Sequence, residues 1–151
     1  MRNKIIREKE IEKKLSDISD NIEIIKENIP LHVSDFLSLG LVKDGIYKKI
    51  EFSIESMIDI LNIINSDLRF GTPENEDDII GNIEKNKVLS KKTIEIVKRM
   101  RGFRNVLVHR YGEINDEEAY ENISSGLKDF ESFSEEIEKF LVKYKNKEKK
   151  R

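Results

Sequence analysis

Apolar residues recur at steps of three and four along nearly the whole chain, and this spacing constrains the fold more than any other feature. One stripe spans residues 11–29 and is followed by Pro30; a second spans residues 46–68 and stops before Gly71-Thr72-Pro73. Such steps place side chains on one face of an α-helix, while glycine and proline interrupt helices. The pattern therefore predicts two long amphipathic helices over these ranges.

The rest of the chain also favours helices. Residues 31–45 suggest a brief helix and a turn, and residues 74–86 a small amphipathic helix. Ser90 resembles the N-cap of a further helix, and Asn115 with Glu118 resembles a capping box that opens the last one. We therefore predict an all-α antiparallel bundle of four long helices and one or two short ones. Residues 1–144 should form one domain, and residues 145–151 a flexible basic tail.

Composition excludes several classes of protein. The 151 residues include no cysteine, which excludes a disulfide scaffold, a thiolate metal site and a cysteine nucleophile. The formal net charge of −2 does not by itself indicate a polyanion partner. The N-terminus lacks the apolar core of a signal peptide, and no apolar run approaches the roughly 18 residues of a membrane span. We expect a soluble, cytoplasmic protein with no membrane partner.

Charge is distributed very unevenly. Residues 90–111 hold seven lysines and arginines against one acid, whereas residues 113–138 hold ten acids against one base. The two helices would neutralise each other if they packed side by side. Alternatively, the basic helix faces a polyanion such as RNA, with Lys98, Arg101 and Arg110 as candidate phosphate contacts. Charge alone does not decide between these two interpretations.

The segment from Met100 to Glu113 carries the chemistry. Asn105 and His109 are four residues apart, so on one helix they share a stripe, and asparagine can fix the tautomer of a histidine. Arg104 and Tyr111 are seven apart and also close in angle, whereas Arg104 and His109 diverge by about 140°. The arginine and histidine converge more easily if the helix ends near His109, or if a twofold partner supplies a second set.

Histidine and arginine together suit RNA cleavage without a metal. Histidine moves a proton from a ribose 2′-hydroxyl or to a leaving oxygen, and arginine binds the phosphate oxygens where charge builds up. The plain structural interpretation is a helix end, where a histidine favours the dipole and the arginines are solvated. His32 lies in a turn-like region and is expected at or near the surface. No spacing typical of a metal site is present, so we expect neither a metal nor a cofactor.

Arg104-Asn105-x-x-x-His109-x-Tyr111 resembles the R-x-x-x-x-H-x-Y signature of HepT-like HEPN proteins. The surrounding sequence is similar to that family too: Gly-Phe leads into Arg104-Asn105, and Tyr111 is followed by Gly-Glu-Ile-Asn and an acidic amphipathic helix. The resemblance extends from about residue 46 to residue 144. No signature position departs from the pattern.

The resemblance implies a homodimer whose two motifs line a cleft at the interface. It implies a toxin-like endoribonuclease that acts on RNA and is encoded beside a MntA-type nucleotidyltransferase antitoxin. Arg104 and His109 would then be catalytic with the support of Asn105, and Tyr111 would receive AMP. AMP adds bulk and negative charge, which would keep RNA out of the cleft. Two other functions stay open: a non-catalytic module that binds or accepts nucleotide from a nucleotidyltransferase, and a purely structural helical protein.

Overall fold

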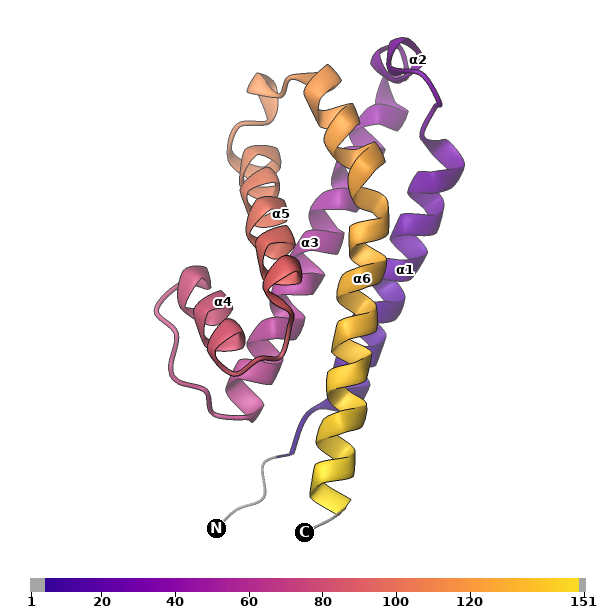
Figure 1. Ribbon diagram of the computed structural model, residues 1–151. Helices are drawn as coiled ribbons and strands as arrows, with labels where there is room; N and C mark the ends of the chain where they lie inside the picture. The colour runs from indigo at the N-terminus through magenta and orange to yellow at the C-terminus, as the bar shows by residue number, and fades with distance from the viewer. Residues whose placement is uncertain (1–4, 150–151) are drawn as a thin grey trace.

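The computed structural model describes residues 5–149 and shows a bundle of α-helices with no strand in that range (Figure 1). The four long helices are α1 (Glu8–Asn28), α3 (Leu41–Asp67), α5 (Lys91–His109) and α6 (Asp116–Lys149). Two helices, α2 (Val33–Leu37) and α4 (Glu76–Lys85), are short, and a 3-10 turn, η1 (Tyr111–Glu113), joins α5 to α6. Successive long helices run in opposite directions, so the predicted antiparallel all-α bundle is confirmed.

Helix α3 lies at the centre of the bundle and contacts α1, α4 and α5. Both predicted apolar stripes are buried: residues 11, 15, 18, 22 and 25 of α1 and residues 46, 50, 54, 57, 61 and 64 of α3. Isoleucine, a mediocre helix former, dominates these positions, so burial rather than intrinsic propensity stabilises the helices. None of the helices within residues 5–149 combines the length and hydropathy needed to cross a bilayer.

Side-chain caps fix where two of the helices begin. Ser90 Oγ accepts the backbone N–H of Thr93 at 3.2 Å, and Asn115 Oδ1 accepts the backbone N–H of Glu118 at 3.1 Å. Both caps were predicted from the sequence and are confirmed, because each satisfies a backbone donor that has no partner inside its helix. The cap at Asn115 sets the first residue of α6, and hence one end of the connection that carries Tyr111.

Part of the segment expected to form a flexible tail is helical. Helix α6 continues to Lys149, and Lys145 Nζ lies 3.0 Å from a carboxylate oxygen of Glu8 on α1. Residues 145–149 are therefore helical in the structure. Residues 150 and 151, the remainder of that expected tail, lie outside the described residues.

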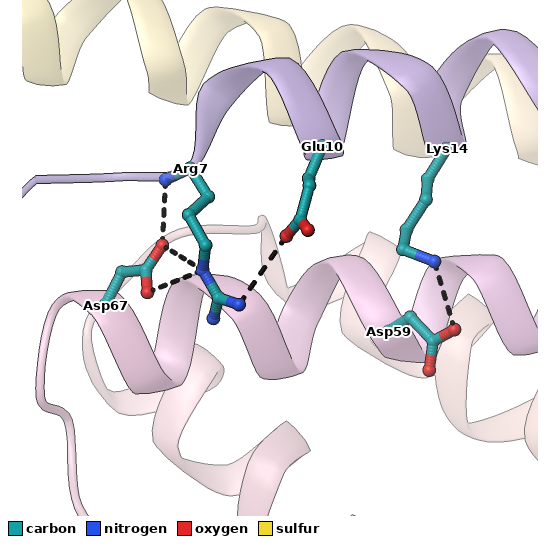
Figure 2. Close-up of polar contacts among 5 residues, drawn as sticks. All are labelled: Arg7, Glu10, Lys14, Asp59 and Asp67. Atoms are coloured by element: carbon teal, nitrogen blue, oxygen red, sulfur yellow. Dashed lines mark hydrogen bonds and ion pairs between the residues drawn. The ribbon is translucent and has the colours of Figure 1, made fainter.

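Helix α1 has its first turn tied to the last turn of α3 (Figure 2). Arg7 occupies the N-cap position of α1 and makes no side-chain cap of its own. Instead, Asp67 accepts the backbone N–H of Arg7 at 2.8 Å and its Nε at 3.0 Å. Asp67 thus caps α1 from a neighbouring helix. The nearby pair of Lys14 and Asp59 has one exposed contact of 3.4 Å.

We predict that Asp67→Ala lowers the free energy of unfolding by about 1–2 kcal/mol, the usual cost of losing a helix cap together with a charged hydrogen bond. Asp59→Ala is the matched control on the same helix, and it should cost less than about 0.5 kcal/mol because its ion pair is exposed. Urea unfolding followed by circular dichroism measures both values. Equal losses in the two variants would contradict a capping role for Asp67.

Candidate active site at the end of helix α5

Helix α5 ends at His109, and the backbone of Arg110 leaves the helix with φ −137° and ψ 40°. Tyr111 therefore begins η1 rather than continuing α5. The expectation that Arg104 and Tyr111 share one helical stripe is wrong, because the helix stops two residues before the tyrosine. The helix does end at His109, which is the first of the two conditions under which Arg104 and His109 would converge more easily, but Arg104 contacts Asn105 and Glu76 instead.

Arg104 turns toward the start of α4. Its Nη2 donates to Glu76 Oε1, its Nε donates to Asn105 Oδ1 at 3.0 Å, and its side chain is 11% exposed. Arg101, one turn earlier, pairs with Asp77 at 2.5 Å. The first turn of α4 thus supplies a carboxylate to each arginine, and these acids also suit the positive end of the helix dipole. Arg104 is oriented and partly neutralised within one chain.

His109 is exposed at the C-terminal end of α5. Within residues 5–149 its imidazole has no hydrogen-bond or ion-pair partner, and the expected bond from Asn105 is not formed, because Asn105 Oδ1 accepts from Arg104 instead. The structure therefore joins Arg104 to Asn105 but leaves His109 apart from both. The imidazole is therefore accessible to a molecule that binds at this end of α5.

Tyr111 is held on the first turn of α3. Its hydroxyl donates to Asp44 Oδ1, and its ring stands edge-on to the ring of Tyr47, with centroids 5.8 Å apart. Tyr47 is buried and donates to Asp116 Oδ1 at 2.6 Å, and Lys43 Nζ donates to Asp116 Oδ2 at 2.7 Å. These contacts fix the position of the Tyr111 side chain, although 44% of the residue stays exposed.

The groups around Tyr111 and Tyr47 disfavour ionisation of both phenol side chains. Burial raises the pKa of Tyr111 above its ordinary value, and the Asp44 carboxylate that accepts its proton raises that pKa further. Burial and the Asp116 carboxylate act in the same way on the pKa of Tyr47. Burial alone would raise the pKa of Asp116, but the hydrogen bonds from Lys43 and Tyr47 lower it on balance. Tyr111 is therefore a neutral hydrogen-bond donor at physiological pH.

A pocket of about 380 Å³ lies between α5 and α6 and reaches α3. Phe103, Val106 and Phe130 line its apolar part, and Arg110 and Glu113 line its rim. Neither Arg104 nor His109 is among the lining residues.

Residues 5–149 contain no group of three histidine, aspartate or glutamate side chains placed to hold a metal ion.

The three candidate phosphate contacts have different neighbours in the structure. Arg101 faces α4, Arg110 lines the pocket beside α6, and Lys98 lies 3.7 Å from Glu95 on its own helix. Among the described residues one ion pair joins α5 to α6, between Arg99 and Asp129 at 2.8 Å. The mutual neutralisation of these two helices is therefore limited, and α4 balances the arginines nearest the motif.

No local sequence signal points to Glu76 or Asp44. They are 28 and 67 residues from the partners that they contact, so only the packing of α4 and α3 against α5 and η1 reveals them. His32, by contrast, lies where the sequence suggested: it is exposed at the N-cap of α2.

We predict that Tyr111→Phe removes one group that titrates above the ordinary tyrosine pKa of about 10. The four tyrosines are followed by ultraviolet absorbance as the pH is raised, and the variant curve is subtracted from that of the wild type. In concentrated denaturant, where Asp44 no longer contacts Tyr111, the difference should shift down to about pH 10. If the difference curve of the folded protein already has its midpoint at about pH 10, the predicted contact between Tyr111 and Asp44 is contradicted.

Comparison with known proteins identifies relatives over most of this bundle. The family model described as Ribonuclease HepT-like matches residues 18–137. The mRNA nuclease HepT of Shewanella oneidensis is 29% identical over 104 residues, which are 69% of this chain and 78% of that protein.

Solved structures agree with this assignment. The structure of the tri-AMPylated Shewanella oneidensis HEPN toxin in complex with MNT antitoxin is similar with a TM-score of 0.78 and 27% identity, over 85% of this chain and 96% of that one. The cytosolic protein of unknown function YutE from Bacillus subtilis shares the fold, with a TM-score of 0.80 and 18% identity over 94% and 95% of the two chains. Because the family model covers most of the chain, including the whole signature, this protein belongs to the HepT-like ribonuclease family.

Proposed function

We propose that this chain is a metal-independent endoribonuclease toxin of a toxin–antitoxin pair, and that it cleaves RNA in a cleft between two copies of itself. The observation that carries the proposal is that α5 ends at His109, which leaves its imidazole exposed beside the turn that bears Tyr111. Arg104 lies on the same helix but faces α4. A second copy that brings its own Arg104 and His109 is a simple way to complete the site.

The reaction follows from the chemistry of these groups. The 2′-hydroxyl of the RNA attacks the adjacent phosphorus, and the bond to the 5′ oxygen of the next nucleotide breaks. His109 takes the proton from the 2′-hydroxyl or gives one to the leaving oxygen. Arg104 stabilises the negative charge that builds on the phosphate oxygens, and Asn105 holds the guanidinium through its 3.0 Å hydrogen bond. Lys98, Arg101 and Arg110 provide further contacts to the strand.

AMP on Tyr111 would silence this activity. The related toxin from Shewanella oneidensis is tri-AMPylated and in complex with MNT antitoxin. In this chain Tyr111 is half-exposed and lies two residues after His109, so a nucleotide on its hydroxyl would occupy the approach to the imidazole. The added phosphate would also repel RNA. The partner is therefore a MntA-type nucleotidyltransferase that acts as the antitoxin.

The alternative function is a non-catalytic module that binds or accepts nucleotide from such an enzyme. The ion pair between Arg104 and Glu76 favours it. An arginine that is already paired with a carboxylate gives less stabilisation to the negative charge that builds on a phosphate during cleavage. The two functions differ in one observable: only the nuclease cleaves RNA when Tyr111 is unmodified.

We predict that the unmodified protein cleaves cellular RNA in the presence of a chelator, and that His109→Ala and Arg104→Ala each lower the rate at least about 100-fold. His32→Ala is the matched control, because His32 is the other histidine of the chain and is exposed at the N-cap of α2, outside the motif. Gel analysis of the RNA fragments measures the rates. Cleavage that persists in His109→Ala would contradict the proposed role of the imidazole.

We also predict that co-expression with the neighbouring nucleotidyltransferase adds AMP-sized increments to the mass of the protein, on a peptide that contains Tyr111. Tyr111→Phe should abolish the increments, whereas Tyr47→Phe should retain them because Tyr47 is buried. Mass spectrometry of the intact and digested protein is the measurement. A modified wild-type protein with an unmodified Tyr111 would refute the regulatory assignment.

A further inference from the structure

Two tyrosine–aspartate pairs lie side by side at the junction of α3, η1 and α6, and they differ in one respect. Asp116 accepts from Tyr47 and from the ammonium of Lys43, so its charge is already balanced. Asp44 accepts from Tyr111, and no lysine, arginine or histidine pairs with it anywhere in residues 5–149. One carboxylate thus serves a buried structural pair, while the other is left with a phenol as its hydrogen-bond donor.

The second pair is also the accessible one. Asp44 is exposed on the first turn of α3 and Tyr111 is 44% exposed, whereas Tyr47 is 2% exposed. The edge-on contact with Tyr47 fixes the Tyr111 ring, so that its hydroxyl stays directed at Asp44. A reagent that approaches from solvent meets a phenol oxygen whose proton already points at a carboxylate.

A neutral phenol is a weak nucleophile, and the surroundings of Tyr111 disfavour its phenolate form. Besides burial, Asp44 and Glu51 on α3 and Asp116 on α6 raise the pKa of Tyr111, while Tyr47 lies edge-on to its ring and Lys43 pairs with Asp116. Because these three groups that raise the pKa are acids, Tyr111 does not react by losing its proton in advance. Its proton has to leave during the attack, which calls for a base in hydrogen-bond contact with the oxygen.

We infer that Asp44 is the proton acceptor for the transfer of a nucleotidyl group to Tyr111, an inference that rests on the modification of Tyr111 proposed above. The phenol oxygen attacks the α-phosphorus of a nucleoside triphosphate held by the partner enzyme, and an oxygen–phosphorus bond forms. The bond from the α-phosphorus to the bridging oxygen breaks, and pyrophosphate leaves with that electron pair. The phenol proton passes to Asp44 Oδ1. The acceptor protein therefore supplies the base for its own modification.

The test measures the rate at which the partner nucleotidyltransferase, with ATP, modifies the full-length protein. Asp44→Asn keeps an oxygen that accepts the hydrogen bond but takes up no proton, so the rate should fall about 100-fold. Asp44→Glu retains a carboxylate and should recover part of the rate. Asp35→Asn is the matched control, because Asp35 is an exposed aspartate at the same end of the bundle with no side-chain partner in the described chain, and it should react like the wild type.

A pH profile separates proton transfer from simple positioning. Without the base, the rate depends on the small fraction of phenolate, so the rate for Asp44→Asn should rise about tenfold per pH unit between pH 7 and 9. The wild-type rate should rise much less over the same range. Thermal unfolding monitored by circular dichroism confirms that each variant is folded.

The outcomes distinguish the two proposals. If the wild type is not modified on Tyr111, the proposed regulation fails and Asp44 has no such role. If the wild type is modified and Asp44→Asn reacts as fast or faster with an unchanged pH profile, the regulation stands and the inference about Asp44 is overturned. Slow modification of Asp44→Asn with the steeper pH profile supports the inference.

Discussion

Helix α3 is buried on several sides, and its apolar packing positions the helices around it. The helix is 27 residues long and packs against α1, α4 and α5. Its first two turns bear Asp44 and Tyr47, which hold Tyr111 in place, and its far end carries Asp67, which caps α1. The apolar contacts of one central helix thus set the positions of the polar contacts at both of its ends.

Carboxylates from neighbouring elements organise the motif more than the acidic last helix does. Glu76 at the start of α4 orients Arg104, and Asp44 at the start of α3 holds Tyr111. Each is an acid in the first turn of its helix, where the helix dipole favours negative charge. Arg104 and Tyr111 are therefore positioned by acids at helix N-termini. His109, which lies between them in the sequence, has no such partner in the described part of the chain and is exposed.

The fold was predictable because apolar spacing and caps are local. The stripes over 11–29 and 46–68, the breaker at Gly71-Thr72-Pro73 and the caps at Ser90 and Asn115 all depend on residues within a few turns of one another. The signature residues could be named for the same reason, since they lie within one segment of eight positions. Their partners could not, because Asp44 and Glu76 approach the motif only through the packing of separate helices. The prediction that Arg104 and Tyr111 share one helical stripe was wrong, because no residue pattern near His109 indicates that α5 ends there.

We propose that Arg104 and His109 of two copies meet around one strand of RNA. A crystal structure of the protein with an RNA whose 2′-hydroxyl is replaced by hydrogen at the cleavage position tests it most directly. We expect a phosphate held between arginine and histidine side chains from both copies, with each Tyr111 at the entrance. A pairing of copies that leaves these side chains on separate outer surfaces, or RNA bound away from them, would contradict it.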